Sequence, residues 1–560
     1  MALKLAVTKK AAPKGPRTSH GGGDQKAGKP KYQLKTPPCQ YKCPSSEDIR
    51  GYLTTIAQAE QYGRSFDDAT ALAFYVLVDK NPIPATMGRV CPHPCQTACN
   101  RKDHDEAVGI NSVEQFIGDF ALKNNLAHKK LVNESRSEKV AVVGSGPAGL
   151  SAAFQLARRG YQVTMFESFP ETGGMLRYGI PSYRLPRNVL DAEVQRILDL
   201  GVELRTNTRV GVDVSFDEIK SQFNAVFLGI GCHKGKKLDI AGEDAPNVFT
   251  GAEYLHRALA GEKVDLGKKV LVVGGGDSAV DAARVALRNG AEVTMLYRRT
   301  REEMPAISRD VDEAIEEGIQ LELLTAPKSI VLENGKAVGL ECFRMELGEP
   351  DASGRRRPVT VAGSEHVVAC DAIIAAVSQE PDAPGLEPAL NKWGWIDVDK
   401  TGKTTLEGVF SGGDVINISL VTTAVGQGRV AAENIDRLLR GEALQGPEDP
   451  KVIYYKDMKI ASTYYPKAPV NKRGHLPVEA RKGNFNDFLL PLSQEQVLAE
   501  AKRCMSCGLC MDCENCYMYC SDNAVLKLPK GQHFKYDLDK CTSCDKCYNQ
   551  CPCGYIDWIE

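Results

Sequence analysis

The spacing of its cysteines constrains this chain more than any other feature of the sequence. Of the 560 residues, 19 are cysteine, and most of them fall in two groups, at 39–99 and 504–553. A disulfide framework is expected in short secreted chains, whereas thiolates two or three residues apart are typical of metal or iron–sulfur ligands in a reducing compartment. The sequence therefore predicts metal clusters in a cytoplasmic protein.

The second group contains the same cysteine run twice. Each run has the spacing Cys-x2-Cys-x2-Cys-x3-Cys, at 510–520 and 541–551, and Pro552 follows the second run. This is the spacing of bacterial two-cluster ferredoxins, in which the fourth cysteine of each run ligates the cluster of the other run. The predicted ligands are Cys510, Cys513, Cys516 and Cys551 for one [4Fe–4S] cluster, and Cys541, Cys544, Cys547 and Cys520 for the other. A pair of zinc sites, each with four cysteine ligands, is the alternative, which the repeated spacing disfavours.

Composition and charge exclude several classes of protein. Hydrophobic residues make up 42% and charged residues 25%, as in ordinary soluble globular chains. The sequence has no apolar run of the length that spans a membrane, and a net charge of −2 argues against a general nucleic-acid-binding protein. Residues 1–35 hold nine Lys or Arg and one acid, which predicts a disordered basic tail, with an organelle-targeting segment as the alternative.

Two glycine-rich turns each join a short β-branched run to a helix. The turn at 144–149 reads Gly-Ser-Gly-Pro-Ala-Gly, and the turn at 274–279 reads Gly-Gly-Gly-Asp-Ser-Ala. The first glycine of such a motif turns the chain, the second lets backbone approach a pyrophosphate, and the third small residue lets helix and strand pack. The sequence therefore predicts two dinucleotide sites in one doubly wound α/β fold. The residues predicted to bind from these turns are Gly144, Gly146, Gly149, Gly274, Gly276, Asp277, Ser278 and Ala279.

The strand that follows each turn distinguishes the two nucleotides. Glu167 ends the first of these strands, where an acid hydrogen-bonds a ribose, whereas the second ends at Tyr297 and continues with Arg298 and Arg299. Guanidinium groups form forked hydrogen bonds to phosphate oxygens, which favours a 2′-phosphate and therefore NADPH over NADH. Solvated surface arginines are the alternative interpretation.

A third motif points to the flavin. Gly413-Asp414 follows a short strand and precedes a helix, an arrangement that resembles the second flavin motif of flavoproteins with two dinucleotide sites. That resemblance implies FAD at the first turn and NAD(P)H at the second, with Asp414 on the ribitol. Gly174 and Gly413 join Glu167 among the predicted flavin-binding residues. No cysteine pair lies beside the second turn, so a redox-active disulfide is not expected. The isolated cysteines Cys232, Cys342 and Cys370 are expected to be buried packing residues.

The segment 88–99 reads Gly-Arg-Val-Cys-Pro-His-Pro-Cys-Gln-Thr-Ala-Cys, and Met304-Pro305 follows the two arginines. With the two turns, these motifs resemble the glutamate synthase small-subunit family of FAD/NAD(P)H iron–sulfur oxidoreductases over about 36–440. The family includes the flavin half of dihydropyrimidine dehydrogenase. With a ferredoxin fused at its C-terminus, the chain is also similar to the iron–sulfur flavoprotein partner of reverse dissimilatory sulfite reductase.

The chain departs from this family at one place. Members begin with a helix ending in Glu-Ala-x-Arg-Cys-x-x-Cys-Gly, but here that motif stands at 500–508, near the opposite end. The family's pairing implies one set of Cys39, Cys43, Cys95 and Cys99, with Cys91 taking a non-cysteine ligand, predicted as Glu114. Cys504 and Cys507 then complete the set of Cys91, giving four clusters. The alternative is three clusters, with Cys504 and Cys507 idle.

The expected architecture combines these motifs. It comprises a basic tail at 1–35, an α-helical iron–sulfur domain at 36–135, an FAD domain at 136–243 and 372–445, an NAD(P)H domain at 244–371, a linker at 446–503 and a ferredoxin-like domain at 504–560. Within the α-helical domain the sequence predicts a helix at 66–78. The expected function is an NAD(P)H:acceptor oxidoreductase that exchanges electrons with a separate redox enzyme or ferredoxin, as part of a hetero-oligomer or a homodimer. No protein acid or base is expected in the hydride step. A glutamate synthase small subunit and a non-catalytic electron-transfer scaffold are the alternatives.

Overall fold

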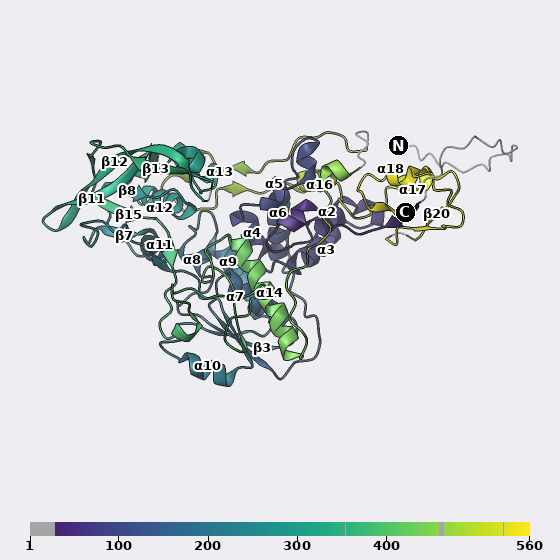
Figure 1. The fold of residues 1–560 in the computed structure, drawn as a ribbon, viewed down its shortest axis with the longest axis horizontal. Coiled ribbons are helices and arrows are strands. Elements are labelled where there is room, and N and C mark those ends of the chain that lie inside the picture. The colour runs from purple at the N-terminus through teal and green to yellow at the C-terminus, as the bar shows by residue number, and fades with distance from the viewer. Residues whose placement is uncertain (1–27, 353, 459–463, 530, 560) are drawn as a thin grey trace. The chain divides into compact units, whose positions relative to one another are not determined.

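The computed structural model describes residues 28–352, 354–458, 464–529 and 531–559, and divides them into two units (Figure 1). The larger unit comprises 35–457 and 465–507, and the smaller one comprises the described residues of 1–34, 458–464 and 508–560. Most of the predicted basic tail lies outside the described residues. Its last part is a strand, β1 (Lys29–Tyr32), so the expectation of disorder is wrong there.

The larger unit begins with a helical domain, as predicted. Its main helices surround one core that also contains Cys43, Cys95 and Cys99. The side chain of Ser65 accepts a hydrogen bond from Asp68 N and caps the predicted helix at 66–78, which is confirmed. The helices of this domain are α1 (Pro38–Lys42), α2 (Ile49–Ala57), α3 (Phe66–Val78), α4 (Pro84–Val90), α5 (Pro94–Thr97) and α6 (Ile110–Lys123).

Two five-stranded parallel sheets follow, as the βαβ pattern predicted. The first has the order β17 (Val409–Ser411), β5 (Ala225–Leu228), β2 (Lys139–Val143), β3 (Gln162–Phe166) and β4 (Glu203–Arg205). Helices α7 (Pro147–Ala157) and α14 (Val421–Leu439) pack side by side in this domain (Figure 1). A Cβ on Gly428 of α14 would lie 2.1 Å from the carbonyl oxygen of Ala148, so the close contact between the two helices requires glycine there.

The second sheet corrects one expected boundary. Its order is β10 (Gln320–Leu323), β9 (Glu292–Tyr297), β8 (Lys269–Val273), β15 (Ala372–Ala375) and β7 (Val248–Thr250). Strand β15 was expected to return the chain to the FAD domain at 372, but it is a fully buried central strand of the nucleotide sheet, paired with β7 and β8. The chain crosses between the two domains at β6 (Lys234–Gly235) and β16 (Gln379–Glu380), which pair with each other.

An antiparallel sheet extends the nucleotide domain. Strands β11 (Thr325–Glu333), β12 (Lys336–Pro350) and β13 (Arg356–Thr360) lie in that order, and β14 (His366–Ala369) also pairs with β12.

Residues 471–492, called here the returning segment, lie in the expected linker yet are built into the larger unit. The segment contains β18 (Gly474–His475), α15 (Val478–Arg481) and β19 (Leu489–Leu490). Phe488 and Leu489 are buried in the core of the nucleotide domain. After the returning segment, α16 (Gln494–Lys502) packs against α2 and α6 of the helical domain.

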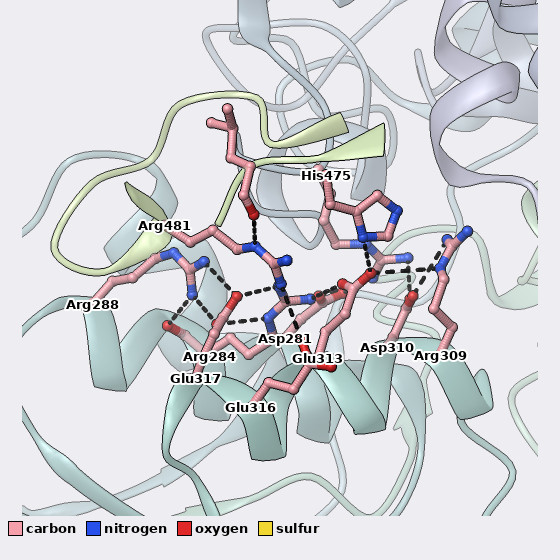
Figure 2. A network of polar contacts seen from close by, with 12 residues as sticks. Asp281, Arg284, Arg288, Arg309, Asp310, Glu313, Glu316, Glu317, His475 and Arg481 are labelled. Atoms are coloured by element: carbon pink, nitrogen blue, oxygen red, sulfur yellow. Dashed lines mark hydrogen bonds and ion pairs between the residues drawn. The ribbon is translucent and has the colours of Figure 1, made fainter. Parts of the chain in front are cut away.

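Figure 2 shows the polar network that joins the returning segment to α12 (Asp277–Arg288) and α13 (Ser308–Glu317). Arg284 has no exposed side-chain surface, and its Nη2 lies 2.6 Å from Glu317 Oε1. His475 Nδ1 lies 3.4 Å from Glu313 Oε1, and Arg481 Nη1 lies 3.6 Å from Glu316 Oε2. The returning segment therefore binds the nucleotide domain by charge as well as by burial.

The smaller unit consists of short elements around cysteines. Strand β1 pairs antiparallel with β22 (Ile556–Ile559), and β20 (Val525–Lys527) pairs with β21 (Phe534–Tyr536). Two short helices, α17 (Asn515–Met518) and α18 (Lys546–Asn549), carry Cys516 and Cys547. The buried part of this unit consists mainly of cysteines, with few aliphatic side chains. Cys504 and Cys507, which the sequence placed in this domain, belong to the larger unit instead.

Candidate functional site

The first glycine-rich turn opens onto a cavity of about 530 Å³. Gly144 has a φ of +98°, and a Cβ there would lie 2.4 Å from the carbonyl oxygen of Gly229. At Gly146 a Cβ would meet nothing within 4 Å, so the backbone is exposed to the cavity. At Gly149 a Cβ would lie 1.9 Å from Gly144 O, which lets α7 pack closely on the turn. Gly174, with a φ of +52°, also lines the cavity, and its Cβ would lie 2.9 Å from the Cα of Gly146.

Two acidic side chains lie in the same cavity lining. Glu167, at the end of β3, accepts hydrogen bonds from Ser145 N at 3.0 Å and Phe169 N at 2.9 Å, and also bonds the Ser145 hydroxyl. Asp414 accepts a hydrogen bond from Ser419 N at 3.1 Å, and burial raises the pKa of its carboxyl group. Both carboxylates are thus held by backbone donors at the cavity wall.

The lining of this cavity fits FAD. The bare backbone of Gly146 offers room for a pyrophosphate, and Val421 and Ala424 bring the N-terminal turn of α14 to the same cavity. Helix N-termini and exposed backbone N–H groups stabilise negative charge, and a buried acid suits a ribose or ribitol hydroxyl. Cys232 is fully buried, as expected of a packing residue, and its thiol donates to Asp414 O at 3.3 Å, so it also lies beside this site.

The second turn has the same form. Gly274 has a φ of +151°, and a Cβ there would lie 2.3 Å from Ala376 O, whereas a Cβ on Gly276 would meet nothing within 4 Å. Ser278 and the buried Ala279 lie in the first turn of α12. The Asp277 carboxylate accepts a hydrogen bond from Ile307 N at 2.9 Å. This turn therefore leaves open backbone at Gly276, as a dinucleotide requires.

The two arginines predicted to bind a 2′-phosphate have different environments. Arg299 is buried, with Nη2 2.8 Å from Asp351 Oδ2 and Nε donating to Arg356 O at 2.7 Å. Arg298 is exposed. Because Arg299 is already bound to an acid 52 positions along the chain, only Arg298 is placed for a phosphate. The sequence could not reveal that pairing, since Asp351 follows three intervening strands.

Four thiols line one cavity in the helical domain. These are Cys39, Cys99, Cys504 and Cys507, with Arg50 and Leu53 of α2 beside them. Burial raises the pKa of the Cys39 thiol, and the neighbouring thiols of Cys99, Cys504 and Cys507 raise it further. Cys507 Sγ also accepts a hydrogen bond from Asn100 Nδ2 at 3.4 Å. The motif at 500–508 thus returns to the N-terminal cysteines.

A second set of thiols lies in the same domain. Burial raises the pKa of the Cys95 thiol, and the charges of Cys43, Cys91 and Glu114 raise it further, which places these four groups together. Glu114 is buried and accepts a hydrogen bond from Asn81 Nδ2 at 2.8 Å.

This arrangement differs from the expected pairing, which put Cys39, Cys43, Cys95 and Cys99 in one set. The difference arises because α16 packs on α2 and carries Cys504 and Cys507 to Cys39 and Cys99, so Cys43 and Cys95 group with Cys91.

The thiols of the smaller unit form two further sets. Cys520, Cys541, Cys544 and Cys547 line one cavity. In the other set, burial raises the pKa of Cys516, and the charges of Cys513 and Cys551 raise it further, while Cys510 has Cys513 and Cys516 as its neighbours. The fourth cysteine of each run therefore lies with the other run. Cys553 is a fifth thiol here, with Sγ 3.7 Å from Cys551 Sγ.

Sequence reasoning missed two tyrosines at these sets. Tyr32 Oη of β1 lies 3.9 Å from Cys516 Sγ, and its ring stacks on that of Tyr536 with centroids 4.6 Å apart. The only signal was the short Lys-Pro-Lys-Tyr run at 29–32, inside what was read as a tail.

All four thiol sets fit iron–sulfur clusters. All 19 cysteines are free thiols, and soft thiolates are the ligands that such clusters take. The hydroxyl of Tyr52 is buried beside Cys43, Cys95 and Glu114 and has no partner among the described residues, which suits a bound group in that space. Cys342 and Cys370 are buried in a hydrophobic core away from the sets, as expected.

Two family models match the chain. Pyridine nucleotide-disulphide oxidoreductase matches residues 138–428, and dihydropyrimidine dehydrogenase domain II, 4Fe-4S cluster, matches residues 28–126. The first match covers more than half of the sequence and includes both glycine-rich turns. The chain belongs to the pyridine nucleotide-disulphide oxidoreductase family.

Several relatives match the chain over most of its length. It is 38% identical over 513 residues to NADPH-Fe(3+) oxidoreductase subunit beta of Geobacter sulfurreducens, with 84% of this chain and 75% of the relative covered. It is 38% identical over 511 residues to NADP(+)-dependent formate dehydrogenase subunit beta of Moorella thermoacetica, covering 84% and 70%. It is 35% identical over 430 residues to the glutamate synthase [NADPH] small chain of Escherichia coli, covering 71% and 88%.

These matches confirm the kinship expected with glutamate synthase small chains and with an N-terminal iron–sulfur region. The protein is an NAD(P)H-dependent oxidoreductase with flavin and [4Fe–4S] centres. Among the residues that the structure describes, no helix is both long and apolar enough to cross a membrane.

Proposed function

We propose that this protein is an electron-input subunit that oxidises NADPH and delivers electrons through four [4Fe–4S] clusters to a separate redox enzyme. Each NADPH gives up a hydride, which carries two electrons, and the electrons leave one at a time. FAD and clusters supply that chemistry when bound, while the protein holds and orients them. The observation that carries the proposal is the meeting of Cys504 and Cys507 with Cys39 and Cys99 in one cavity.

The proposed ligands follow the thiol sets of the structure. In the helical domain the sets are Cys39, Cys99, Cys504 and Cys507, and Cys43, Cys91, Cys95 and Glu114. In the smaller unit, which we propose to be a two-cluster ferredoxin, they are Cys510, Cys513, Cys516 and Cys551, and Cys520, Cys541, Cys544 and Cys547. Fifteen cysteines and one carboxylate are used, and Cys553 stays a free neighbour.

We propose that the set with Cys43 receives electrons first. Thr422 lies in the first turn of α14, between two residues that line the flavin cavity. The Ser45 hydroxyl donates to Thr422 O at 3.0 Å, and Ser45 follows Cys43 by two positions. A Cβ on Gly426 would lie 2.2 Å from Pro44 O, so α14 and the Cys43 loop are in close contact. This contact joins the lining of the flavin cavity directly to the loop that carries Cys43.

The nucleotide and the partner are proposed from the site and from the relatives. Exposed Arg298, beside the second turn, is the residue proposed to bind a 2′-phosphate. Two relatives that cover most of this chain are named as NADPH- or NADP(+)-dependent beta subunits. Both observations support NADPH, and the subunit names support a partner that completes the complex.

Iron analysis of the purified holoprotein tests the four-cluster proposal. Four [4Fe–4S] clusters predict about 16 Fe per chain, and three predict about 12. The Cys504→Ser/Cys507→Ser variant is expected to lose about four Fe, while the matched Cys342→Ser/Cys370→Ser variant keeps all of it. Unchanged iron in the first variant would contradict the proposal and favour three clusters.

The reaction itself is tested by dye reduction. NADPH-dependent reduction of a one-electron dye by the wild-type protein supports an electron-input enzyme, and its absence would favour a scaffold. Glutamate formation on mixing with a glutamate synthase large subunit would instead support the role of a glutamate synthase small chain.

A further inference from the structure

Helix α2 contributes a polar side chain to each of the two thiol sets in the helical domain. Arg50 lines the cavity of Cys39, Cys99, Cys504 and Cys507. Tyr52, two positions further along the helix, packs in the core with Cys43 and Cys95. Neither residue belongs to a cysteine motif, and the function proposed above uses neither.

The Tyr52 hydroxyl is a buried donor without a partner. The residue is 0% exposed, and its oxygen makes no hydrogen bond with any described residue. Burial raises the pKa of Tyr52, and the charges of Glu114, Glu47, Cys95 and Cys43 raise it further, which places the hydroxyl beside that set. Buried hydroxyls in native proteins are almost always hydrogen-bonded. The missing acceptor therefore belongs to a group that this space holds.

Arg50 likewise has a buried donor without a partner, at the set of Cys39, Cys99, Cys504 and Cys507. It is 6% exposed, and Nη1 donates to Cys507 O at 2.6 Å and to Lys35 O at 2.9 Å. Its Nε is buried with no acceptor, and no carboxylate among the described residues lies within ion-pair distance of the guanidinium. The guanidinium of Arg50 therefore lines the thiol cavity without an ion-pair partner among the described residues.

The charges around the two sets differ. Glu47 and Glu114 are buried beside Cys43, where Glu114 is itself a proposed ligand. At the other set, Arg101 and Arg503 lie near Cys99, but both bind Asp105, at 2.5 Å and 3.1 Å. Asp48 also lies near Cys504, but it accepts a hydrogen bond from Gly51 N at 2.9 Å and forms no ion pair with Arg50. Arg50 is thus the cation at the Cys39 set that no described carboxylate pairs with, while buried acids surround the Cys43 set.

We propose that α2 gives the two clusters different reduction potentials, with Arg50 Nε donating to a sulfur of the cluster at Cys39 and Tyr52 Oη to a sulfur of the cluster at Cys43. This rests on the proposed function, which places a cluster at each set. Hydrogen bonds to cluster sulfurs and nearby positive charge stabilise the reduced form and raise the potential. A guanidinium carries a full positive charge, whereas a hydroxyl is neutral. At the Cys43 set the nearby acid Glu47 also lowers the potential, against the effect of Tyr52.

The cluster at Cys39 therefore has the higher potential, and electrons run from the Cys43 set toward the Cys39 set. Arg50 and Tyr52 act as positioning residues, because they change the potential without ligating iron. The direction agrees with the contact between the Cys43 loop and the flavin cavity, which is an independent observation.

Redox titration of the holoprotein, followed by electron paramagnetic resonance, tests the proposal. The substitution Tyr52→Phe removes one oxygen and is expected to lower the midpoint potential of one cluster, leaving the other three unchanged. Arg50→Met is expected to lower the potential of a different cluster, by more than Tyr52→Phe does. Arg50→Lys, which keeps the charge, restores part of that shift. Tyr62→Phe, a half-exposed tyrosine after the same helix, is the control and leaves all four potentials unchanged.

Iron content separates this inference from the proposed function. Wild-type protein with fewer than about 16 Fe would contradict the function. Full iron with unshifted potentials in both Tyr52→Phe and Arg50→Met would overturn the inference alone. If a variant loses iron, the wild-type protein is measured in H2O and again after exchange into D2O. We expect each of the two clusters to show a coupling to an exchangeable proton that disappears in D2O. No such coupling at either cluster overturns the proposal.

Discussion

The Ser45 hydroxyl donates a 3.0 Å hydrogen bond to the carbonyl oxygen of Thr422, in a place from which solvent is excluded. This bond joins the loop after Cys43 to the first turn of α14, whose neighbouring residues line the flavin cavity. Two segments that are 377 positions apart in sequence are thereby fixed together, one from the iron–sulfur domain and one from the flavin domain.

This contact predicts a selective kinetic defect. In Gly426→Ala the new methyl group would lie 2.2 Å from Pro44 O, a backbone atom, so α14 and the Cys43 loop must separate. We expect flavin reduction by NADPH to keep its wild-type rate, while transfer onward to the clusters slows several-fold. Stopped-flow absorbance of flavin and clusters in the same sample measures both steps. A slower first step with an unchanged second step would contradict the proposed order of centres.

The two arginines after β9 predict different outcomes. Arg298→Ala should raise the KM for NADPH about tenfold or more and leave the KM for NADH unchanged, because a charge-assisted hydrogen bond contributes about 1.5–3 kcal/mol. Arg299→Ala should instead lower thermal stability and alter both KM values alike, because its partner Asp351 loses its cation. Steady-state kinetics with both nucleotides measure the ratio. Equal effects of Arg298→Ala on the two nucleotides would end the assignment.

The buried network of Figure 2 predicts how stability depends on pH. Burial raises the pKa of Glu317, but hydrogen bonds from Arg288 and Arg284 lower it more, so the net shift is downward from 4.5. A group whose pKa is lower in the folded state stabilises the protein above its unfolded pKa, and that contribution is lost as the pH falls through the folded value. The contribution of Glu317 to the free energy of unfolding should therefore decrease as the pH falls below about 4.5.

Glu317→Gln tests this contribution against its exposed neighbour. We expect a marked loss of stability at pH 7, because removing one partner of a buried ion pair costs about 3–5 kcal/mol. Glu316→Gln, whose side chain is 57% exposed, should lie within about 0.5 kcal/mol of wild type. Denaturant titrations at pH 7 and pH 4 compare the two variants. Wild-type stability in Glu317→Gln at pH 7 would show that the network is neutral.

The sequence predicted features that depend on neighbouring residues, and it failed where residues far apart in the sequence come into contact. The turns at 144–149 and 274–279 and the helix at 66–78 are local patterns, and the structure has each of them in the expected form. Arg299 was wrongly assigned to a phosphate, because its partner Asp351 lies in a loop far along the chain and the sequence does not reveal their ion pair. The pairing of Cys39 depended on α16 packing against α2, which no local spacing encodes.

The same limit applies to the boundaries. Ala372-Ile373-Ile374-Ala375 has the composition of a buried parallel strand in either sheet, and only the pairing with β7 and β8 assigns it. The returning segment has only a weak hydrophobic periodicity, because its two strands are two residues long and because ion pairs with α13 help to hold it.

The pairing of β1 with β22 predicts that the smaller unit needs residues from the start of the chain. Lys29–Tyr32 supplies an edge strand, and Lys29 Nζ also donates to Cys541 O at 2.6 Å. Tyr32 brings its ring onto Tyr536 and its hydroxyl to Cys516. Deleting residues 1–33 should therefore cost up to about eight Fe per chain, since both clusters of this unit lose contacts.

Deletion of residues 1–27 is the matched control, because it leaves β1 in place. Iron content and FAD content of the two truncated proteins are compared with those of the full chain. We expect the shorter deletion to keep iron and FAD, and the longer one to lose iron while FAD remains. The flavin cavity lies in the larger unit and shares no residue with β1. Full iron after deletion of 1–33 would mean that β22 and the ferredoxin runs hold their clusters without the N-terminal strand.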